Sequence, residues 1–331
     1  MPTETREITF AQAINEAMHE EMSNDDSVIV LGEDVAAFGG VYKLTQGLLA
    51  EFGPARVLDT PISEASIVGL GVGAAVTGLR PIVEVMFGDF LGLAMDQIVN
   101  QAAKIHYMSG GELRVPLVIR TTMGAGKRAA AQHSQTLSAW LAHIPGLKVV
   151  VPSTPYDAKG LLKTAIHDNN PVIFFEDKMM YQRKGIVPAP SDAYTVPFGQ
   201  ADLKRAGRDL TLIATSSMVY VALEAADELA TQGIEAEVID PRTLTPLDEG
   251  TLIDSVKKTA HCIVIDEGYQ RYGVTAEIAA IVAEKAFYNL EAPVRRIGAM
   301  DVPLPFAPVL EDQTIPTSAD VARTARELLG R

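Results

Sequence analysis

The first half of the chain contains short, continuous runs of Val, Ile and Leu that are separated by stretches with helical periodicity. A strand with one face in water alternates apolar and polar residues, whereas a strand covered on both faces is apolar throughout. The runs therefore indicate buried strands of a parallel sheet, joined by helices that cover it. The predicted strands are residues 28–31, 57–58, 81–86, 115–121, 147–151 and 172–175.

A segment rich in proline and glycine interrupts this pattern at residues 185–202. It contains Pro188, Pro190, Pro197 and Gly199 and has no hydrophobic period, so it is predicted to be a linker. A second alternation of strands and helices follows it. The 331-residue chain is thus predicted to have a two-domain α/β fold, with residues 1–184 in a parallel-sheet domain and residues 203–331 in a smaller α/β domain.

The charge and the cysteine content argue against some classes of protein. The formal net charge of −14 at pH 7 disfavours nucleic acid or an anionic membrane surface as the main partner. Cys262 is the only cysteine and lies in an apolar run, so it is predicted to be a buried strand residue rather than a nucleophile. The lack of an internal disulfide fits a reducing compartment.

The N-terminus is predicted to be part of the fold, because it shows no charged segment followed by an apolar run of the signal-peptide type. Thr9 and Gln12 have the spacing of a capping box, and apolar residues recur after them at helical intervals. The longest uncharged apolar stretch, residues 67–79, is too short and too rich in glycine to span a bilayer. These features predict a soluble, cytoplasmic protein.

Several familiar ligand motifs are incomplete in this sequence. Gly69, Gly71 and Gly73 loosely match a dinucleotide fingerprint, but they lie inside a predicted helix instead of at its start. Small residues at such positions are typical of a helix that packs closely against a neighbour. The histidines have no second ligand at metal-binding spacing, and no Gly-x-x-x-x-Gly-Lys-Ser/Thr loop is present. The sequence therefore does not favour a nicotinamide, nucleoside triphosphate or histidine-metal site.

Two other segments combine reactive side chains with a position that suits a site. Glu64 lies in the first turn of an apolar helix that Ser63 is placed to cap, where a carboxylate also simply complements the helix dipole. The loop 124–135 follows a predicted strand and contains glycines, Lys127, Arg128 and His133. Loops at the carboxyl ends of parallel strands are where open α/β sheets bind ligands. From the residues alone, His133 is either a site residue or an ordinary loop histidine.

A series of short stretches matches one protein family in order along nearly the whole chain. The main stretches are 31–34 (Leu-Gly-Glu-Asp), 59–64 (Asp-Thr-Pro-Ile-Ser-Glu), 78–81 (Gly-Leu-Arg-Pro), 107–111 (Tyr-Met-Ser-Gly-Gly), 131–135 (Ala-Gln-His-Ser-Gln), 168–171 (Asp-Asn-Asn-Pro), 240–244 (Asp-Pro-Arg-Thr-Leu) and 266–268 (Asp-Glu-Gly). Together they resemble the beta subunits of the thiamine-diphosphate-dependent decarboxylating component of 2-oxo acid dehydrogenase complexes. These subunits belong to the transketolase-like superfamily and include the pyruvate and acetoin dehydrogenase types.

The resemblance implies a fold and three site residues. The fold would be a thiamine pyrimidine-binding α/β domain followed by a transketolase-type C-terminal α/β domain, in agreement with the predicted division. Glu64 would be the carboxylate that faces N1′ of the cofactor's aminopyrimidine ring, and Phe90 would pack on that ring. His133 would assist proton transfer or the transfer to a lipoyl group. Lys127 and Arg128 would either contact the substrate or simply solvate the loop, and the second is preferred.

The resemblance also implies that another chain completes the cofactor site. Thiamine enzymes hold Mg²⁺ and the diphosphate with a Gly-Asp-Gly motif, whereas residues 88–90 of this chain are Gly-Asp-Phe. An alpha subunit would supply the missing half in an α2β2 heterotetramer, and the isolated beta chain would be inactive. Some relatives also bind K⁺ in a segment whose residue types are equally expected at the end of a helix. The matching residues are Leu117, Ala165, Ile166, Asp168 and Asn170.

The resemblance finally bears on partners and substrate. A dihydrolipoamide acyltransferase core would be a further partner, and the acidic balance of the chain suits the basic subunit-binding module of such cores. Gln132 before His133 resembles the pyruvate and acetoin types, and residues 143–148 and 152–159 look closest to acetoin dehydrogenases. Acetoin is therefore slightly preferred over pyruvate, with a branched-chain 2-oxo acid as the alternative. A noncatalytic docking subunit and a nicotinamide-dependent dehydrogenase are the alternatives from other classes.

Overall fold

The computed structural model describes residues 4–189 and 193–331, and the chain divides into two compact units. The first unit comprises Met1–Met123 and Trp140–Phe198, and the second comprises Gly124–Ala139 and Gly199–Arg331. The loop that carries His133 therefore belongs to the second unit, although a strand of the first unit precedes it in the chain. The domain boundaries at residues 184 and 203 stay predictions, and Pro190 of the predicted linker lies outside the described residues.

The main sheet of the first unit is parallel, as its continuous apolar runs predict. Its strands lie in the order β6-β7-β5-β4-β2-β3, and all of the pairings between them are parallel. Their bounds are β2 (Val28–Gly32), β3 (Val57–Asp59), β4 (Arg80–Phe87), β5 (Val118–Met123), β6 (Lys148–Val150) and β7 (Val172–Asp177). A separate antiparallel pair joins β1 (Thr5–Thr9) to β8 (Lys184–Pro188), which reaches into the predicted linker.

Two helices of the first unit confirm features that the sequence predicts. Helix α1 (Phe10–Asn24) begins with the capping box, in which the Thr9 hydroxyl accepts from the Gln12 N–H at 3.1 Å and Gln12 accepts from the Thr9 N–H at 2.8 Å. Helix α3 (Glu64–Val76) contains the glycine series in its interior. A Cβ atom at Gly71 would lie 2.5 Å from a methyl group of Val83, so the small residue permits close packing on β4.

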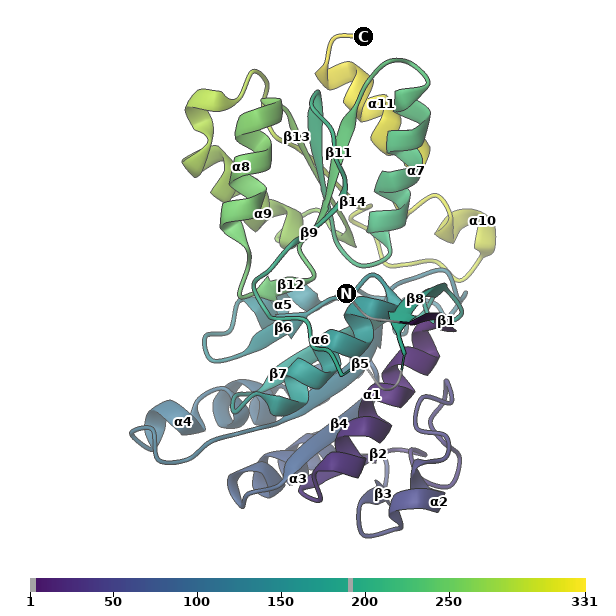
Figure 1. Ribbon diagram of the computed structural model, residues 1–331, viewed down its shortest axis with the longest axis vertical. Coiled ribbons are helices and arrows are strands. Elements are labelled where there is room, and N and C mark those ends of the chain that lie inside the picture. The colour runs from purple at the N-terminus through teal and green to yellow at the C-terminus, as the bar shows by residue number, and fades with distance from the viewer. Residues whose placement is uncertain (1–3, 190–192) are drawn as a thin grey trace. The chain divides into compact units, whose positions relative to one another are not determined.

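The remaining helical segments of this part of the chain are short. They are α2 (Leu48–Phe52), η1 (Gly88–Ala94), η2 (Gln97–Ala102), α4 (Ile105–Met108) and α5 (Ser138–Ala142). Helix α6 (Pro155–His167) is longer and lies beside α1 (Figure 1). Within the described ranges, no helix is both long and apolar enough to cross a bilayer.

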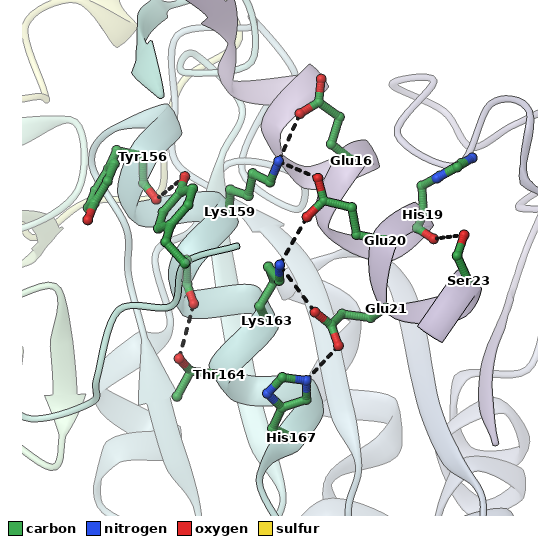
Figure 2. Close-up of polar contacts among 12 residues, drawn as sticks. Glu16, His19, Glu20, Glu21, Ser23, Tyr156, Lys159, Lys163, Thr164 and His167 are labelled. Atoms are coloured by element: carbon green, nitrogen blue, oxygen red, sulfur yellow. Dashed lines mark hydrogen bonds and ion pairs between the residues drawn. The ribbon is translucent and has the colours of Figure 1, made fainter. Parts of the chain in front are cut away.

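A ladder of opposite charges joins α1 to α6 (Figure 2). The acidic side chains come from α1 and the basic ones from α6. The basic residues recur every four positions along one helix face, and Glu16 and Glu20 have the same spacing, with Glu21 next to Glu20. Lys159 is only 2 % exposed, so its ammonium group relies on these carboxylates for hydrogen bonds. The pairs are Lys159 with Glu16 (3.1 Å) and Glu20 (2.6 Å), Lys163 with Glu20 (3.0 Å) and Glu21 (3.5 Å), and His167 with Glu21 (2.6 Å).

The second unit is a smaller α/β sandwich with a five-stranded sheet in the order β14-β13-β10-β11-β9. Helices α7 and α11 cover one face of the sheet and α8 and α9 cover the other, so each face has its own apolar core (Figure 1). The strands are β9 (Asp202–Arg205), β10 (Leu210–Ala214), β11 (Ala236–Asp240), β13 (Cys262–Tyr269) and β14 (Arg295–Ala299). The helices are α7 (Met218–Ala230), α8 (Glu249–Thr259), α9 (Val274–Lys285) and α11 (Ser318–Leu328), with the short elements β12 (Thr243–Thr245), η3 (Phe287–Asn289) and α10 (Pro308–Glu311).

Cys262 is a buried residue of β13, as predicted, and its burial raises the pKa of its thiol to about 12. We expect the folded protein to react with a thiol reagent at pH 8 about 10³-fold more slowly than the unfolded chain, because the thiolate is the reactive form. Release of the chromophore from a disulfide reagent, followed in buffer and in urea, measures both rates. Cys262→Ala is the blank, and fast stoichiometric labelling of the native protein would contradict burial of this thiol.

Candidate functional site

The candidate residues of the first unit lie where three neighbouring parallel strands end. Glu33 follows β2 directly, Glu64 follows β3 after a short turn, and Phe90 lies in η1, which follows β4. The chain passes from β2 to β3 on one side and then to β4 on the other, so the order of strands reverses here. Open α/β sheets bind ligands at the carboxyl edge of such a reversal. The fold thus brings Glu64 and Phe90 to one edge, where α3 packs against η1.

Glu64 is the first residue of α3 and its side chain is largely removed from solvent, with 8 % of the residue exposed. Among residues 4–189 and 193–331, no donor forms a hydrogen bond or ion pair with its carboxylate. The predicted cap by Ser63 is wrong, because its backbone departs from capping geometry and its hydroxyl donates to the Ser66 hydroxyl at 2.9 Å. A buried carboxylate without a donor is unfavourable, so this position suits a ligand that brings one.

Glu33 is a second carboxylate at this edge, and the sequence did not single it out as a site residue. Partial burial raises the pKa of its carboxyl group, and the nearby charge of Glu64 raises it further. The two carboxylates therefore lie close enough to repel each other. The signal in the sequence was its position, because Glu33 is the first residue after a fully buried strand.

Phe90 is half-buried and forms an edge-to-face contact with Phe87, with ring centroids 5.6 Å apart and an interplanar angle of 72°. The ammonium group of Lys178, a residue that is only 1 % exposed, lies 5.5 Å from the Phe87 ring centroid. This cation–π contact fixes the position of the Phe87 ring, against which the Phe90 ring packs. The aromatic pair therefore presents a firmly packed apolar surface at the end of β4.

A buried ion network lies across the middle of the same sheet. Arg120 of β5 is 1 % exposed and donates to both carboxylate oxygens of Glu176 on β7, at 2.7 and 2.9 Å. It also donates to Glu84 on β4 at 3.0 Å, and the Tyr181 hydroxyl donates to Glu176 at 2.9 Å. Burial raises the pKa of Glu84 even though Arg120 opposes this effect. A single guanidinium group therefore balances the negative charges of two carboxylates that have almost no access to water.

His133 lies in the loop segment of the second unit and is half-buried, with its backbone N–H donating to the Ala130 carbonyl at 3.3 Å. Its neighbours Gln132 and Gln135 line a cavity of about 430 Å³. The other lining residues are Ala131, Tyr269, Asp301, Val302 and Pro303, all from the same unit. The predicted site residues are thus divided between the units, with Glu64 and Phe90 in the first and His133 in the second.

The segment predicted to bind K⁺ surrounds the end of α6, and a cationic side chain already contacts it. Arg80 donates one hydrogen bond to the Ile166 carbonyl at 2.9 Å and another to the Asp168 carbonyl at 3.1 Å. The Asp168 carboxylate accepts from the Asn170 backbone and side chain at 2.8 and 2.9 Å. Leu117 contributes its carbonyl to a bond from the Val172 N–H at 2.8 Å, and the Ala165 carbonyl accepts from the Asp168 N–H at 3.3 Å.

Asp168→Asn should destabilise the protein by about 1 kcal/mol at pH 7, and the loss should shrink in acid. Burial acts to raise the pKa of Asp168, but the ion pair with Lys148 and the bonds from Asn170 outweigh it and lower the pKa. The lowered pKa stabilises the fold above the ordinary aspartate pKa of about 4, and this contribution is lost as the pH falls through the folded-state value. Urea unfolding at pH 7 and pH 3.5 measures the difference. Asp26→Asn, at a fully exposed side chain, is the control. If both variants lower the stability equally, Asp168 does not stabilise the fold through its ion pair and hydrogen bonds.

Comparison with known proteins identifies the family of the chain. Residues 6–184 match the pyrimidine-binding domain of transketolase and residues 199–321 match the transketolase C-terminal domain. The chain is 54 % identical to the acetoin:2,6-dichlorophenolindophenol oxidoreductase subunit beta of Bacillus subtilis, with 98 % of each chain covered. It is 49 % identical to the pyruvate dehydrogenase E1 component subunit beta of Rickettsia felis, over 97 % of this chain and 98 % of the relative.

Solved structures share the fold at lower sequence identity. A chain described as a split gene transketolase, inactive beta4 tetramer, superposes with a TM-score of 0.78 at 24 % identity, with 98 % of each chain covered. Transketolase from Leishmania mexicana superposes with a TM-score of 0.73 at 18 % identity, and the match spans 47 % of that longer chain. Both predicted domains, in the predicted order, are thus confirmed as transketolase-type α/β domains. The chain belongs to the transketolase-type family that includes the beta subunits of acetoin and pyruvate dehydrogenases.

Proposed function

We propose that the chain is the beta subunit of a thiamine-diphosphate-dependent dehydrogenase, active only with an alpha subunit. The reaction is cleavage of the substrate C–C bond next to the carbonyl group, and the two-carbon unit passes to the lipoyl group of an acyltransferase partner. The observation that carries this proposal is the buried carboxylate of Glu64. It has no donor among the described residues and lies at the strand edge where an α/β sheet binds its ligand.

The residues present fit the pyrimidine half of thiamine diphosphate. Glu64 would share a proton with the N1′ atom of the aminopyrimidine ring, and Phe90 would offer its ring for stacking. Glu33 is a second carboxylate near this position, and the charge of Glu64 adds to the burial that raises the pKa of Glu33. When bound, thiamine diphosphate supplies an electron sink for the electron pair released on C–C cleavage.

His133 is proposed to act on the substrate side of the site, as a proton donor or acceptor near the reacting carbonyl group. Histidine is the side chain that most often carries out such a transfer in enzymes. Gln132 and Gln135, which are close to His133 in the sequence, line the cavity described above. This cavity offers room for a small polar substrate or acceptor. Phe90 and Glu64 would then serve the cofactor, and His133 the substrate.

The missing parts of the site are assigned to partners. Residues 88–90 lack the second glycine of the magnesium and diphosphate motif, so an alpha subunit in an α2β2 assembly is proposed to supply that half. A dihydrolipoamide acyltransferase core is the proposed recipient of the product. A potassium ion belongs to the same proposal, and it would share the Ile166 carbonyl with Arg80. Its other ligands would come from Leu117, Ala165, Asp168 and Asn170.

Acetoin is the proposed substrate, ahead of pyruvate. Two relatives that carry the acetoin name are 54 % and 50 % identical to this chain, and two that carry the pyruvate name are 50 % and 49 % identical. The difference is small, so pyruvate stays the second candidate and a branched-chain 2-oxo acid the third.

The test is reconstitution with an alpha subunit in the presence of thiamine diphosphate and Mg²⁺. Substrate-dependent reduction of an electron-accepting dye should appear in the mixture and not with either chain alone. A panel of acetoin, pyruvate, 2-oxobutyrate and branched-chain 2-oxo acids ranks the substrates by kcat/KM. Dye reduction by the beta chain alone would refute the half-site, and a preference for branched-chain acids would refute the proposed substrate.

A further inference from the structure

We infer that Arg128 and Glu311 are positioning residues, which hold the loop of His133 in its working conformation. The inference rests on the proposed role of His133 and extends it, because it gives the second unit a part in the reaction. Neither residue needs to contact substrate or cofactor to have this effect. The expectation that Arg128 simply solvates the loop is wrong, since its guanidinium group is engaged in ion pairs.

The first observation is that two carboxylates accept hydrogen bonds from backbone N–H groups at the start of the loop. The Ala125 N–H donates to Glu267 at 2.9 Å, and the Gly126 N–H donates to Glu311 at 2.9 Å. Hydrogen bonds from an N–H group to a charged acceptor are stronger than those between neutral groups. The loop is therefore attached to β13 and α10 at two successive residues.

The second observation is that one fully buried carboxylate makes both the backbone contact and an ion pair. Glu311 is 0 % exposed, and its other oxygen accepts from Arg128 at 2.6 Å. The same guanidinium nitrogen also donates to Asp312 at 2.7 Å. Removal of Arg128 would leave the buried charge of Glu311 with a single backbone donor. The ion pair is thus part of what keeps this carboxylate, and hence Gly126, in place.

The third observation is the conformation of the loop itself. Arg128 and Ala130 have φ angles of 57° and 62°, in the left-handed region that is unfavourable for a residue with a Cβ atom. Such a conformation persists only where surrounding contacts determine it. Ala130 then supplies the carbonyl that accepts from the His133 N–H. Glu311 and Arg128 therefore hold the segment just before Ala130, and Ala130 in turn contacts His133.

The fourth observation is the place where the loop lies. In the second sheet the strand order reverses between β10 and β13, so the carboxyl end of β13 is where such a sheet would bind a ligand. Glu267 lies at this end, and a Cβ atom at Gly268 would approach the Thr136 carbonyl to 3.4 Å. The protein's own loop occupies the position of a ligand. The second unit thus supports the loop that carries His133 at the position where such a sheet would otherwise bind a ligand.

The test compares two neighbouring cations of the loop in the reconstituted complex. Arg128→Ala should lower kcat by about 10- to 100-fold with KM changed less than about twofold, because a displaced catalytic group slows the reaction more than binding. Lys127 is exposed and forms no ion pair among the described residues, so Lys127→Ala is the matched control and should keep kcat. Arg128→Lys should restore part of the loss. Equal activities of the two alanine variants would overturn the inference.

Two further measurements separate this inference from the proposed function. In a His133→Ala background, Arg128→Ala should cause no additional loss of kcat, because a positioning residue acts through the group that it positions. Hydrogen exchange of the peptide covering residues 124–133 should be at least about tenfold faster in Arg128→Ala than in Lys127→Ala. Full activity of His133→Ala would refute the proposed role of His133, whereas unchanged exchange would overturn the inference whatever the role of His133.

Discussion

Replacement of Glu64 by glutamine should lower kcat of the reconstituted complex by about 10²- to 10⁴-fold, the range of a lost proton-transfer group. Glutamine has nearly the same shape and can still form hydrogen bonds, but it cannot take up a proton at neutral pH. The packing of α3 on β4 should therefore survive, and the loss should fall on the chemical step. Steady-state dye reduction with saturating thiamine diphosphate measures kcat and KM separately.

Two companion variants make the result specific. Glu64→Asp keeps the charge and shortens the side chain, so its kcat should lie between those of the parent and the glutamine variant. Glu112→Gln changes an exposed carboxylate of the same unit and should leave kcat within about twofold. If Glu64→Gln keeps more than half of the parent activity, the carboxylate is not part of the chemistry and the proposed function loses its main support.

The second large effect concerns stability. Arg120→Met should reduce the free energy of unfolding by about 3–5 kcal/mol at pH 7, because it leaves Glu84 and Glu176 buried without their cation. The loss should be smaller at pH 5 than at pH 7. Burial already raises the pKa of Glu84, and without the opposing charge of Arg120 this carboxyl group takes up a proton in the folded state at still higher pH. Urea unfolding of the complex at fixed protein concentration measures both values.

Arg114→Met is the matched control, since Arg114 is exposed in the same unit and its replacement should cost less than about 0.5 kcal/mol. A second variant keeps the prediction testable if Arg120→Met does not fold. Arg120→Lys retains one positive charge but not the paired contact with Glu176, so it should be intermediate in stability. Equal stabilities of Arg120→Met and Arg114→Met would show that the network does not contribute to folding.

The parallel sheet of the first unit could be predicted because strands that are buried on both faces are continuous apolar runs in the sequence. The exact ends of the strands and helices could not be predicted where a proline or a helix cap shifts them. The run 115–121 predicts one strand, yet β5 begins at Val118. Pro116 has no N–H for the sheet, and the residue before a proline avoids the regular ladder. Helix α11 likewise begins at Ser318, where Thr317 and Asp320 form a capping box.

The candidate site could be predicted only in part, and the physical reason is distance along the chain. Glu64 was visible because a carboxylate at a helix start is a local pattern. The partners of Arg128 were not, since Glu311 lies on the far side of the linker and no short-range pattern joins the two residues. Arg120 likewise interrupts an apolar run, and its charge has a meaning only beside Glu84 and Glu176 on neighbouring strands.

The attachment of Gly124–Ala139 to the second unit has a consequence for how the gene could be divided. A break within residues 185–202 would separate the two family domains neatly in the sequence, but it would remove the loop from the half that holds it. The C-terminal fragment would then expose the carboxylates of Glu267 and Glu311 without the amide donors that they bind in the intact chain. The second unit therefore needs a segment that lies within the sequence of the first family domain.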